Sequence, residues 1–233
     1  MLEVKQLSKF YGKKKVLDGV SFTVQPNEIT CLIGLNGAGK TTLMNAMMQL
    51  TPYQEGEVLL NGPAVTVQDF NRIAYVPDKN ILLKQMTIQE ALDYQATYYQ
   101  SFNEKKASRL VEFFKLKRDD VIGSLSKGNI ARANLLMAMS LDSDYLLLDE
   151  PFSGIDVLTR DRIASIFSTE LLENKGVLLA THEIQEIEHL VDKVVMLDEG
   201  RVVREFYPEE VRLSEGLSIV DVMKEVYGHE EVY

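Results

Sequence analysis

The chain of 233 residues has a single cysteine, no polybasic run and no long apolar segment. One cysteine cannot form an internal disulfide, and Cys31 lies in an apolar run, so we interpret it as a small core residue in a reducing compartment. No run of about 18 apolar residues could span a bilayer, and no secretory leader opens the sequence. The sequence therefore predicts a soluble, cytosolic protein.

Basic residues are also scarce relative to acidic ones. Lys and Arg number 25 against 35 Asp and Glu, which gives a formal net charge of −10. This balance argues against nonspecific binding of nucleic acid and against docking to anionic lipid. The hydrophobic content of 45% and the charged content of 26% are typical of a globular protein with a sizeable core. No internal repeat or low-complexity linker divides the chain.

The most informative stretch runs from Cys31 to Leu43. Residues 34–41 fit the pattern G-x-x-x-x-G-K-[ST] and lie between a short apolar run and a helical pattern, as a phosphate-binding loop (P-loop) requires. An ordinary glycine-rich turn with a solvated lysine is the alternative, but the complete motif in this setting favours the P-loop. Lys40 would reach the β- and γ-phosphates of a nucleotide, and the Thr41 hydroxyl would hold Mg²⁺.

Short apolar runs alternate with helical patterns along the chain. This alternation predicts an α/β fold with a mainly parallel sheet covered on both faces. We expect strands within 1–24, in the apolar run from Ile29 that precedes the P-loop, and at 57–60, 73–76, 145–148, 177–180, 194–197 and 201–206. We expect helices at about 40–49, 87–99, 103–114 and 130–141, further helical patterns between the last strands, and one helix from 218. The helices between about 86 and 141 form a predicted insertion.

Charged and polar side chains follow two of these strands. Asp149 and Glu150 come directly after Leu146–Leu148, at the carboxyl end of a strand, where α/β folds collect their ligands. Asp149 is placed to order Mg²⁺, and Glu150 could polarise a water for attack on the γ-phosphorus. A solvated acidic turn is the alternative for this pair. His182 follows the next strand, where it could donate a hydrogen bond to a γ-phosphate, although an isolated histidine is more often structural.

A second helix start resembles an anion site. Ser126 and the Gly128 amide precede the helical pattern at 130–141, where a hydroxyl and free N–H groups favour an anion. One nucleotide needs only one such cradle, so the second helix start is a surplus that the mechanism has to explain.

Five motifs taken in order resemble the ATP-binding-cassette ATPases, which are the nucleotide-binding subunits of ABC transporters. The resemblance covers about residues 1 to 206 and rests on residues 34–42, 125–129, 146–151, 153–156 and 181–182. It implies a single cassette over 1–233: a P-loop NTPase (RecA-like) core, an antiparallel β-subdomain near the N-terminus, the helical subdomain at about 86–141 and a short tail at about 208–233.

In that family two cassettes pair head to tail, and each ATP is held between the P-loop of one and the signature sequence of the other. The resemblance implies that Tyr11 stacks on adenine, that Ser126 and Gly128 contact the γ-phosphate across the dimer, and that Asp156 belongs to the loop joining the two sites. Glu150 matches the catalytic base and His182 the switch histidine. The implied nucleotide-binding residues of the P-loop are Gly34, Asn36, Gly37, Ala38, Gly39, Lys40, Thr41 and Thr42.

The sequence departs from the family pattern in two places. The signature usually reads Leu-Ser-Gly-Gly-Gln, and here Lys127 and Asn129 replace its first Gly and its Gln. After the strand at 73–76 the family usually has a Gln that touches Mg²⁺ and the attacking water and connects to the transmembrane partner. This chain has Pro77-Asp78 there. A carboxylate could bind the metal more tightly, so Asp78 joins Thr41 and Asp149 as a predicted metal ligand, but it adds repulsion toward the γ-phosphate.

The function implied by the resemblance is hydrolysis of ATP to ADP and phosphate, with Mg²⁺, coupled to a separate transmembrane permease. The chain would sit on the cytoplasmic face of the cell membrane through that permease, as a homodimer or with a different cassette. Its length and ending resemble the ATPase subunits of exporters of drugs or antimicrobial peptides, although an importer subunit is an alternative. Two further hypotheses are a soluble cassette that acts on ribosomes or DNA and a hydrolysis-impaired regulatory cassette.

Overall fold

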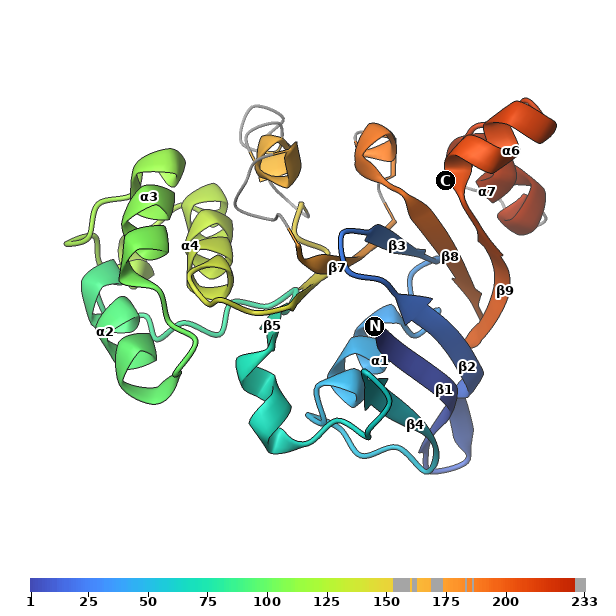
Figure 1. The fold of residues 1–233 in the computed structure, drawn as a ribbon, viewed down its shortest axis with the longest axis horizontal. Coiled ribbons are helices and arrows are strands. Elements are labelled where there is room, and N and C mark those ends of the chain that lie inside the picture. Colours follow the sequence, from blue (N-terminus) through green and yellow to red (C-terminus); the bar gives the residue numbers. More distant parts are fainter. Residues whose placement is uncertain (153–159, 161–162, 169–173, 183, 186, 229–233) are drawn as a thin grey trace.

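Two sheets organise the chain in the computed structural model, which describes residues 1–152, 160, 163–168, 174–182, 184–185 and 187–228 (Figure 1). The larger sheet has six strands in the order β5-β6-β7-β3-β8-β9. All its neighbours pair in parallel except β8 and β9. In chain order its strands are β3 (Ile29–Ile33), β5 (Ile73–Val76), β6 (Tyr145–Asp149), β7 (Gly176–Thr181), β8 (Lys193–Asp198) and β9 (Arg201–Phe206).

The smaller sheet is antiparallel, with the order β2-β1-β4. Its strands are β1 (Leu2–Tyr11), β2 (Lys14–Val24) and β4 (Glu55–Leu60). The helix α1 (Lys40–Met47) lies beside it in Figure 1, and the two share one apolar cluster with alternate residues of the larger sheet. Leu147, Leu178 and Val195 belong to this cluster, so α1 is packed between the two sheets.

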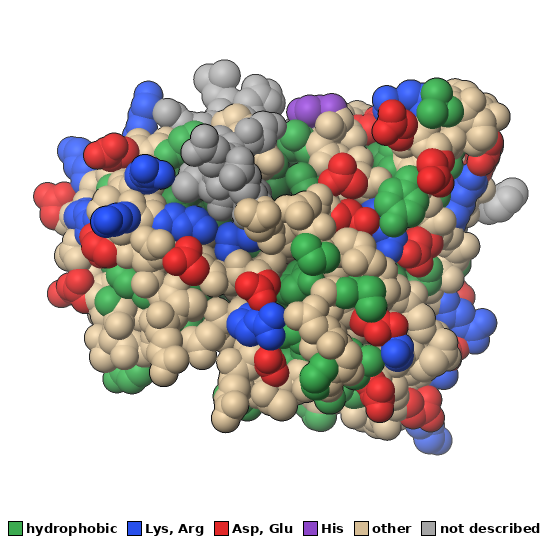
Figure 2. All heavy atoms as spheres, viewed as in Figure 1, with side chains coloured by type: hydrophobic (Ala, Val, Ile, Leu, Met, Phe, Trp, Pro, Cys, Tyr) green, Lys and Arg blue, Asp and Glu red, His purple; other side chains and the backbone are tan. Residues whose placement is uncertain are grey.

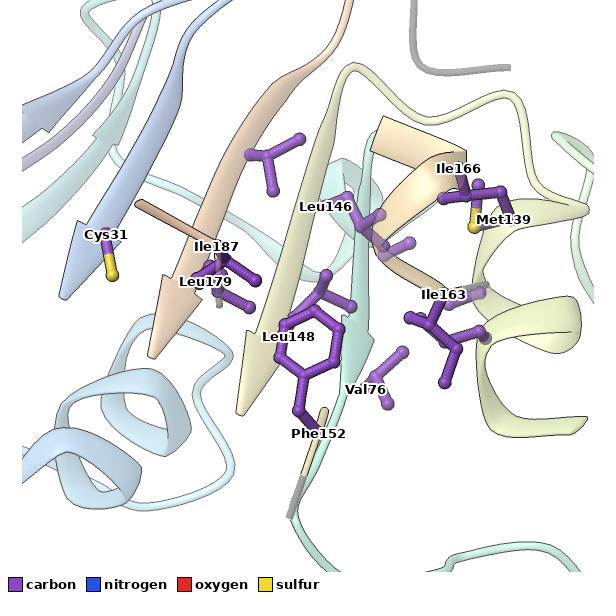
Figure 3. Packing of buried hydrophobic residues seen from close by; sticks show 14 of the residues in the cluster. Cys31, Val76, Met139, Leu146, Leu148, Phe152, Ile163, Ile166, Leu179 and Ile187 are labelled. Atoms are coloured by element: carbon purple, nitrogen blue, oxygen red, sulfur yellow. The ribbon is translucent and has the colours of Figure 1, made fainter. Parts of the chain in front are cut away.

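The neighbouring residues of the same strands point to the opposite face, because successive side chains in a strand alternate. Figure 3 shows Leu146 and Leu148 of β6 together with Leu179 of β7 on that face, where they pack in a second cluster. Cys31 belongs to the same cluster and is fully buried, and burial raises the pKa of its thiol above the ordinary value. Cys31 is therefore the small core residue that the sequence predicts.

Three helices stand at one end of the molecule, on the side of β5 (Figure 1). They are α2 (Ile88–Tyr98), α3 (Glu104–Phe114) and α4 (Lys127–Met139), and all lie within the predicted range of 86–141. Thr87 forms a capping box with Glu90 at the start of α2, and Asn103 accepts a hydrogen bond from the Lys106 N–H at the start of α3. Local sequence thus sets where these helices begin.

Two short helices of the tail, α6 (Pro208–Ser214) and α7 (Ile219–Tyr227), lie at the other end, beside β8 and β9 (Figure 1). Single turns of 3₁₀-helix complete the described part of the chain. They are η1 (Val67–Asn71), η2 (Ile122–Ser124), η3 (Ser165–Ser168) and η5 (Glu188–Leu190).

The predicted α/β class with a mainly parallel sheet, an antiparallel N-terminal sheet and inserted helices is confirmed. Some boundaries differ. The helix predicted from about residue 130 begins at Lys127, because the Ser126 side chain accepts a hydrogen bond from the Asn129 N–H and caps it there. The helical pattern expected between β7 and β8 forms only the turn η5 among the residues described.

The surface in Figure 2 shows acidic and basic side chains interspersed, with no continuous basic stripe on the face in view. This agrees with the net charge of −10. Among the residues that the structure describes, no helix is both long and apolar enough to cross a bilayer.

Candidate functional site

The P-loop joins β3, in the middle of the larger sheet, to α1. Gly37 and Gly39 have φ angles of +88° and +111°, a region that side chains disfavour, so the turn into α1 needs glycine at both positions. A Cβ at Gly34 would lie 2.6 Å from the carbonyl oxygen of Leu197, so this position also excludes a side chain. The motif is therefore explained residue by residue by the backbone path.

Accessibility divides the loop into an exposed rim and a buried base. Asn36, Gly37 and Thr41 are exposed, Thr42 is half-buried, and Ala38, Gly39 and Lys40 are buried. The Ala38 carbonyl accepts a hydrogen bond from the Gly200 N–H at 3.1 Å, which ties the loop to the turn between β8 and β9. The exposed rim leaves backbone N–H groups at the start of α1 accessible to an anion.

Lys40 is 6% exposed and turns back over its own loop. Its ammonium group donates to the Gly34 carbonyl at 2.7 Å and lies 3.4 Å from a carboxylate oxygen of Glu150. The P-loop cation is therefore in direct contact with the carboxylate of the residue that follows β6.

Asp149 is the last residue of β6 and is completely buried. Within the described part of the chain, neither of its carboxylate oxygens has a hydrogen-bond partner of ordinary geometry. Burial raises the pKa of Asp149, the nearby Thr41 hydroxyl and the charge of Lys40 lower it, and the charges of Glu150 and Asp78 raise it, so that the pKa is about 6. A buried carboxylate without partners next to a threonine hydroxyl fits a divalent cation, which prefers oxygen ligands.

Glu150 turns out of the strand with φ +49°, and its N–H donates to the Ala180 carbonyl at 2.9 Å. This turn aims Glu150 differently from Asp149, as predicted. Both its carboxylate oxygens lie 3.0 Å from Nδ1 of His182. His182 reaches this place because β7, which it follows, pairs with both β6 and β3. The structure thus brings Lys40, Asp149, Glu150 and His182 together at one sheet edge.

Asp78 lies two residues beyond β5, at the same edge of the sheet. Together with Lys127 and Glu150 it lines a cavity of about 360 Å³ between the core and α4. Its charge contributes to the raised pKa values of Asp149 and Tyr75. Both departures from the family pattern, Asp78 and Lys127, therefore border one cavity beside Glu150.

The comparisons with known proteins agree with this geometry. Residues 17–153 match the family model described as ABC transporter. "Nod factor export ATP-binding protein I" of Burkholderia pseudomallei (strain K96243) is 35% identical over 240 residues, covering 99% of this chain and 78% of the relative. The chain belongs to the ABC transporter family.

Two further similarities cover nearly whole chains. "Lipopolysaccharide export system ATP-binding protein LptB" of Haemophilus influenzae is 28% identical over 226 residues, which is 92% of this chain and 94% of that protein. A solved structure titled "Structure of ATP binding subunit of ABC transporter" superposes with a TM-score of 0.86 at 29% identity, covering 98% of each chain. This cassette is thus an ABC ATPase, an ATP-binding subunit whose hydrolysis of ATP is coupled to transport.

Three predicted nucleotide contacts of the cassette lie apart from this cluster. Ser126 caps α4, with Gly128 in its first turn, and no hydrogen bond or ion pair joins either to a P-loop side chain among the residues described. Tyr11 ends β1, with 53% of its surface exposed and Lys9 Nζ 4.6 Å from its ring centre. Asp156 lies outside the described residues.

Sequence reasoning missed two partners of the site. It did not find the Lys40–Glu150 contact or the ammonium of Lys9 over Tyr11. The contact between Lys9 and Tyr11 could have been predicted, because residues two apart on a strand point to the same face. The contact between Lys40 and Glu150 could not be predicted from a single sequence, since it depends on which strands become neighbours.

Proposed function

We propose that this cassette binds MgATP at the P-loop, pairs head to tail with a second cassette, and drives a separate transmembrane permease of the exporter type. The observation that carries the proposal is the convergence of Lys40, Asp149, Glu150 and His182 at the carboxyl edge of the central strands. These are the groups that phosphoryl transfer to water needs: a phosphate-binding cation, a metal-ordering carboxylate, a base and a hydrogen-bond donor.

Each group has a defined task in the proposed reaction. Lys40 exchanges its carbonyl partner for phosphate oxygens, and Thr41 and Asp149 hold Mg²⁺, which neutralises charge on the phosphates when it is bound. Glu150 accepts a hydrogen bond from the attacking water, and His182, 3.0 Å away, fixes its carboxylate in place. Tyr11 stacks on the adenine, with Lys9 adding a positive charge against its ring. Asp78 is the third proposed metal ligand.

The second cassette supplies the remaining contacts. Ser126 and Gly128 form a helix start without a nucleotide partner in their own chain, and a helix of 13 residues presents its positive end there. A facing P-loop brings the phosphates that this end attracts. Asp156 is the residue proposed to join the two sites.

The permease is proposed to contact the gap between the core and the helical subdomain. A cavity of about 570 Å³ opens there, adjoining Pro77 and lined mainly by apolar residues of β5, α2 and α4. Leu50, Ile81, Leu83 and Tyr94 expose large apolar surfaces at this cavity. Exposed apolar surface of this kind marks protein contacts, and binding here would place the cassette on the cytoplasmic face of the membrane.

Export is the favoured direction because relatives that cover most of the chain are named for export, of Nod factor and of lipopolysaccharide. Efflux of a drug or an antimicrobial peptide is the finer proposal for the cargo. A hydrolysis-impaired regulatory cassette is the second candidate, and Asp78 with Lys127 beside Glu150 is the observation in its favour.

Three measurements test the proposal. The purified cassette is expected to release phosphate from MgATP, and E150Q with saturating MgATP is expected to dimerise in size-exclusion chromatography with light scattering. The permease should copurify with the tagged chain from detergent-solubilised membranes. Hydrolysis that stays at the level of K40A would favour the regulatory candidate, and E150Q that stays monomeric even with its permease would overturn the shared site.

A further inference from the structure

The tail contacts both ends of the strand that leads into the P-loop. The Tyr207 hydroxyl, just before α6, donates to the Glu28 carboxylate at 3.3 Å, next to the start of β3. The Tyr227 hydroxyl, at the end of α7, donates to the carbonyl of Ile33, the last residue of β3, at 3.2 Å. One tail therefore places two tyrosines at opposite ends of one five-residue strand.

Tyr227 makes a second contact at the same point. Its hydroxyl lies 3.1 Å from the carbonyl oxygen of Leu197 in β8. A hydroxyl has one proton, which is shared here between the two carbonyls. The side chain is only 4% exposed, and burial together with the charge of Asp198 raises the pKa of Tyr227, so the group stays protonated and remains a donor.

The two carbonyls that Tyr227 holds border the P-loop directly. Ile33 precedes Gly34, and the Leu197 carbonyl is the group that a side chain at Gly34 would meet at 2.6 Å. The Gly34 carbonyl in turn accepts the hydrogen bond from Lys40 at 2.7 Å. The contact made by Tyr227 and the contact made by the phosphate-binding lysine thus fall on the carbonyls of adjacent residues, Ile33 and Gly34.

The helix that carries Tyr227 is itself fixed at its other end. Ser218 and Asp221 form a capping box at the start of α7. The Ile219 N–H donates to the Glu188 carboxylate at 2.9 Å, in the segment that follows His182. Val222, in the middle of α7, is fully buried in the cluster on that face of the sheet. Tyr227 is therefore presented to the two carbonyls by a helix with little freedom to shift.

We infer that Tyr227 is a positioning residue for ATP binding, which holds the ends of β3 and β8 at the spacing that keeps Gly34 and Lys40 ready for phosphates. The inference rests on the proposed ATP site at the P-loop and adds the tail as its support. Without the hydroxyl, both carbonyls lose a buried hydrogen-bond donor, and the contact that joins the ends of β3 and β8 is removed.

The test compares two tyrosine-to-phenylalanine changes in the full chain. Y227F is expected to weaken MgATP binding about three- to tenfold, with a matching rise in KM and nearly unchanged kcat. Y207F removes the same atom at the other end of the same strand and is expected to leave Kd and KM at wild-type values. Binding is measured by isothermal titration calorimetry and turnover by phosphate release.

A merely structural role has a different outcome. It would lower the Tm of Y227F while Kd for MgATP stays at the wild-type value, and this result, or equal effects of Y227F and Y207F, overturns the inference. If Y227F cannot be purified in a folded form, S218A is the second variant, because it loosens α7 and keeps the Tyr227 hydroxyl. A raised KM of S218A supports the inference, and an unchanged KM contradicts it. Failure of the proposed function would instead appear as absent hydrolysis in the wild-type chain.

Discussion

At the scale of single residues, the site depends on one backbone irregularity. Glu150 adopts φ +49° directly after a fully regular strand, a conformation that costs a residue with a side chain about 1 kcal/mol or more. This turn directs its carboxylate toward Lys40 and His182. Asp149 next to it continues the strand and stays in the interior. Two adjacent carboxyl groups thereby acquire different surroundings and different proposed tasks.

The E150Q variant keeps the size of the side chain and removes the base. We expect MgATP binding to persist while phosphate release falls by about 10²- to 10⁴-fold, because the amide cannot accept a proton from water. E209Q, at an exposed position in α6, is the control and should retain wild-type turnover. Turnover of E150Q within threefold of the wild type, a margin of roughly 0.7 kcal/mol, would remove Glu150 from the proposed role.

At Asp78, replacement of the carboxylate by an amide is expected to have the opposite effect on turnover. D78Q replaces a carboxylate that repels the γ-phosphate with a neutral group that can still contact a metal, so we expect ATPase activity that is kept or raised. D119Q, an exposed change outside the cavity shared by Asp78 and Lys127, serves for comparison. A collapse of activity in D78Q alone would mean that the negative charge itself is required.

At the scale of elements, the joint between the helical subdomain and the core contains a buried amine. Lys175, just before β7, donates to the carbonyl and the hydroxyl of Ser143. Burial and the nearby ammonium of Lys106 lower the pKa of Lys175, and Asp142 and Asp144 raise it, so that the pKa is about 8. Lys106 belongs to α3, so two positive charges from different parts of the fold share one joint.

This pKa makes stability depend on pH in a defined direction. Between about pH 10.5 and pH 8 the unfolded chain takes up a proton that the folded Lys175 does not, so stability falls as the pH falls through this window. From pH 7.5 to 9.5 the free energy of unfolding should gain roughly 1 to 2 kcal/mol from this group. In K175M the gain should disappear, as followed by urea denaturation.

The exposed Lys224 provides the reference for that experiment, since K224M should keep the pH dependence of the wild type. Equal pH dependence in K175M and the wild type would show that Lys175 titrates normally in the folded protein.

Helix starts and the P-loop could be predicted from a single sequence, whereas the order of the strands could not. The starts of α2 and α3 were predictable at Thr87 and Asn103, because capping uses residues three apart. The P-loop was predictable because its glycines occupy backbone positions that a residue with a side chain disfavours. The order of the strands was not, since β3 pairs with segments far along the chain. The role of Tyr227 was hidden for the same reason: its partners are backbone carbonyls, which carry no sequence signal.

At the scale of the whole molecule, two helix starts are proposed to bind anions, and no hydrogen bond or ion pair joins them among the residues that the structure describes. One is the P-loop at α1, and the other is the Ser126 cap of α4. Lys127, the residue after Ser126, lines the same cavity as Asp78 and Glu150. The proposed site shared between two cassettes explains both helix starts, because one nucleotide would contact the P-loop of one cassette and the Ser126 cap of the other.

Removal of the Ser126 hydroxyl tests this arrangement. In an E150Q background, S126A should still bind MgATP as a monomer but should dimerise at least about tenfold more weakly, because a hydrogen bond to a charged phosphate is lost in each half of the dimer. N103A removes the cap of α3, at a similar cost of about 1 kcal/mol to helix stability, and should dimerise normally. Dimerisation lost equally in both variants would point to the subdomain's stability instead.

The position of β3 in the middle of its sheet has a consequence for biosynthesis. The strand is made early, yet its neighbours β7 and β8 and its contact with Tyr227 come from residues 176–227. At about 5 to 20 residues per second, a ribosome needs roughly 10 to 40 seconds to add them after β3. During that interval the nascent chain carries a complete phosphate-binding motif without the neighbouring strands that shape it, so we expect nucleotide binding only after β7 and β8, the second of which ends at Asp198, have been made.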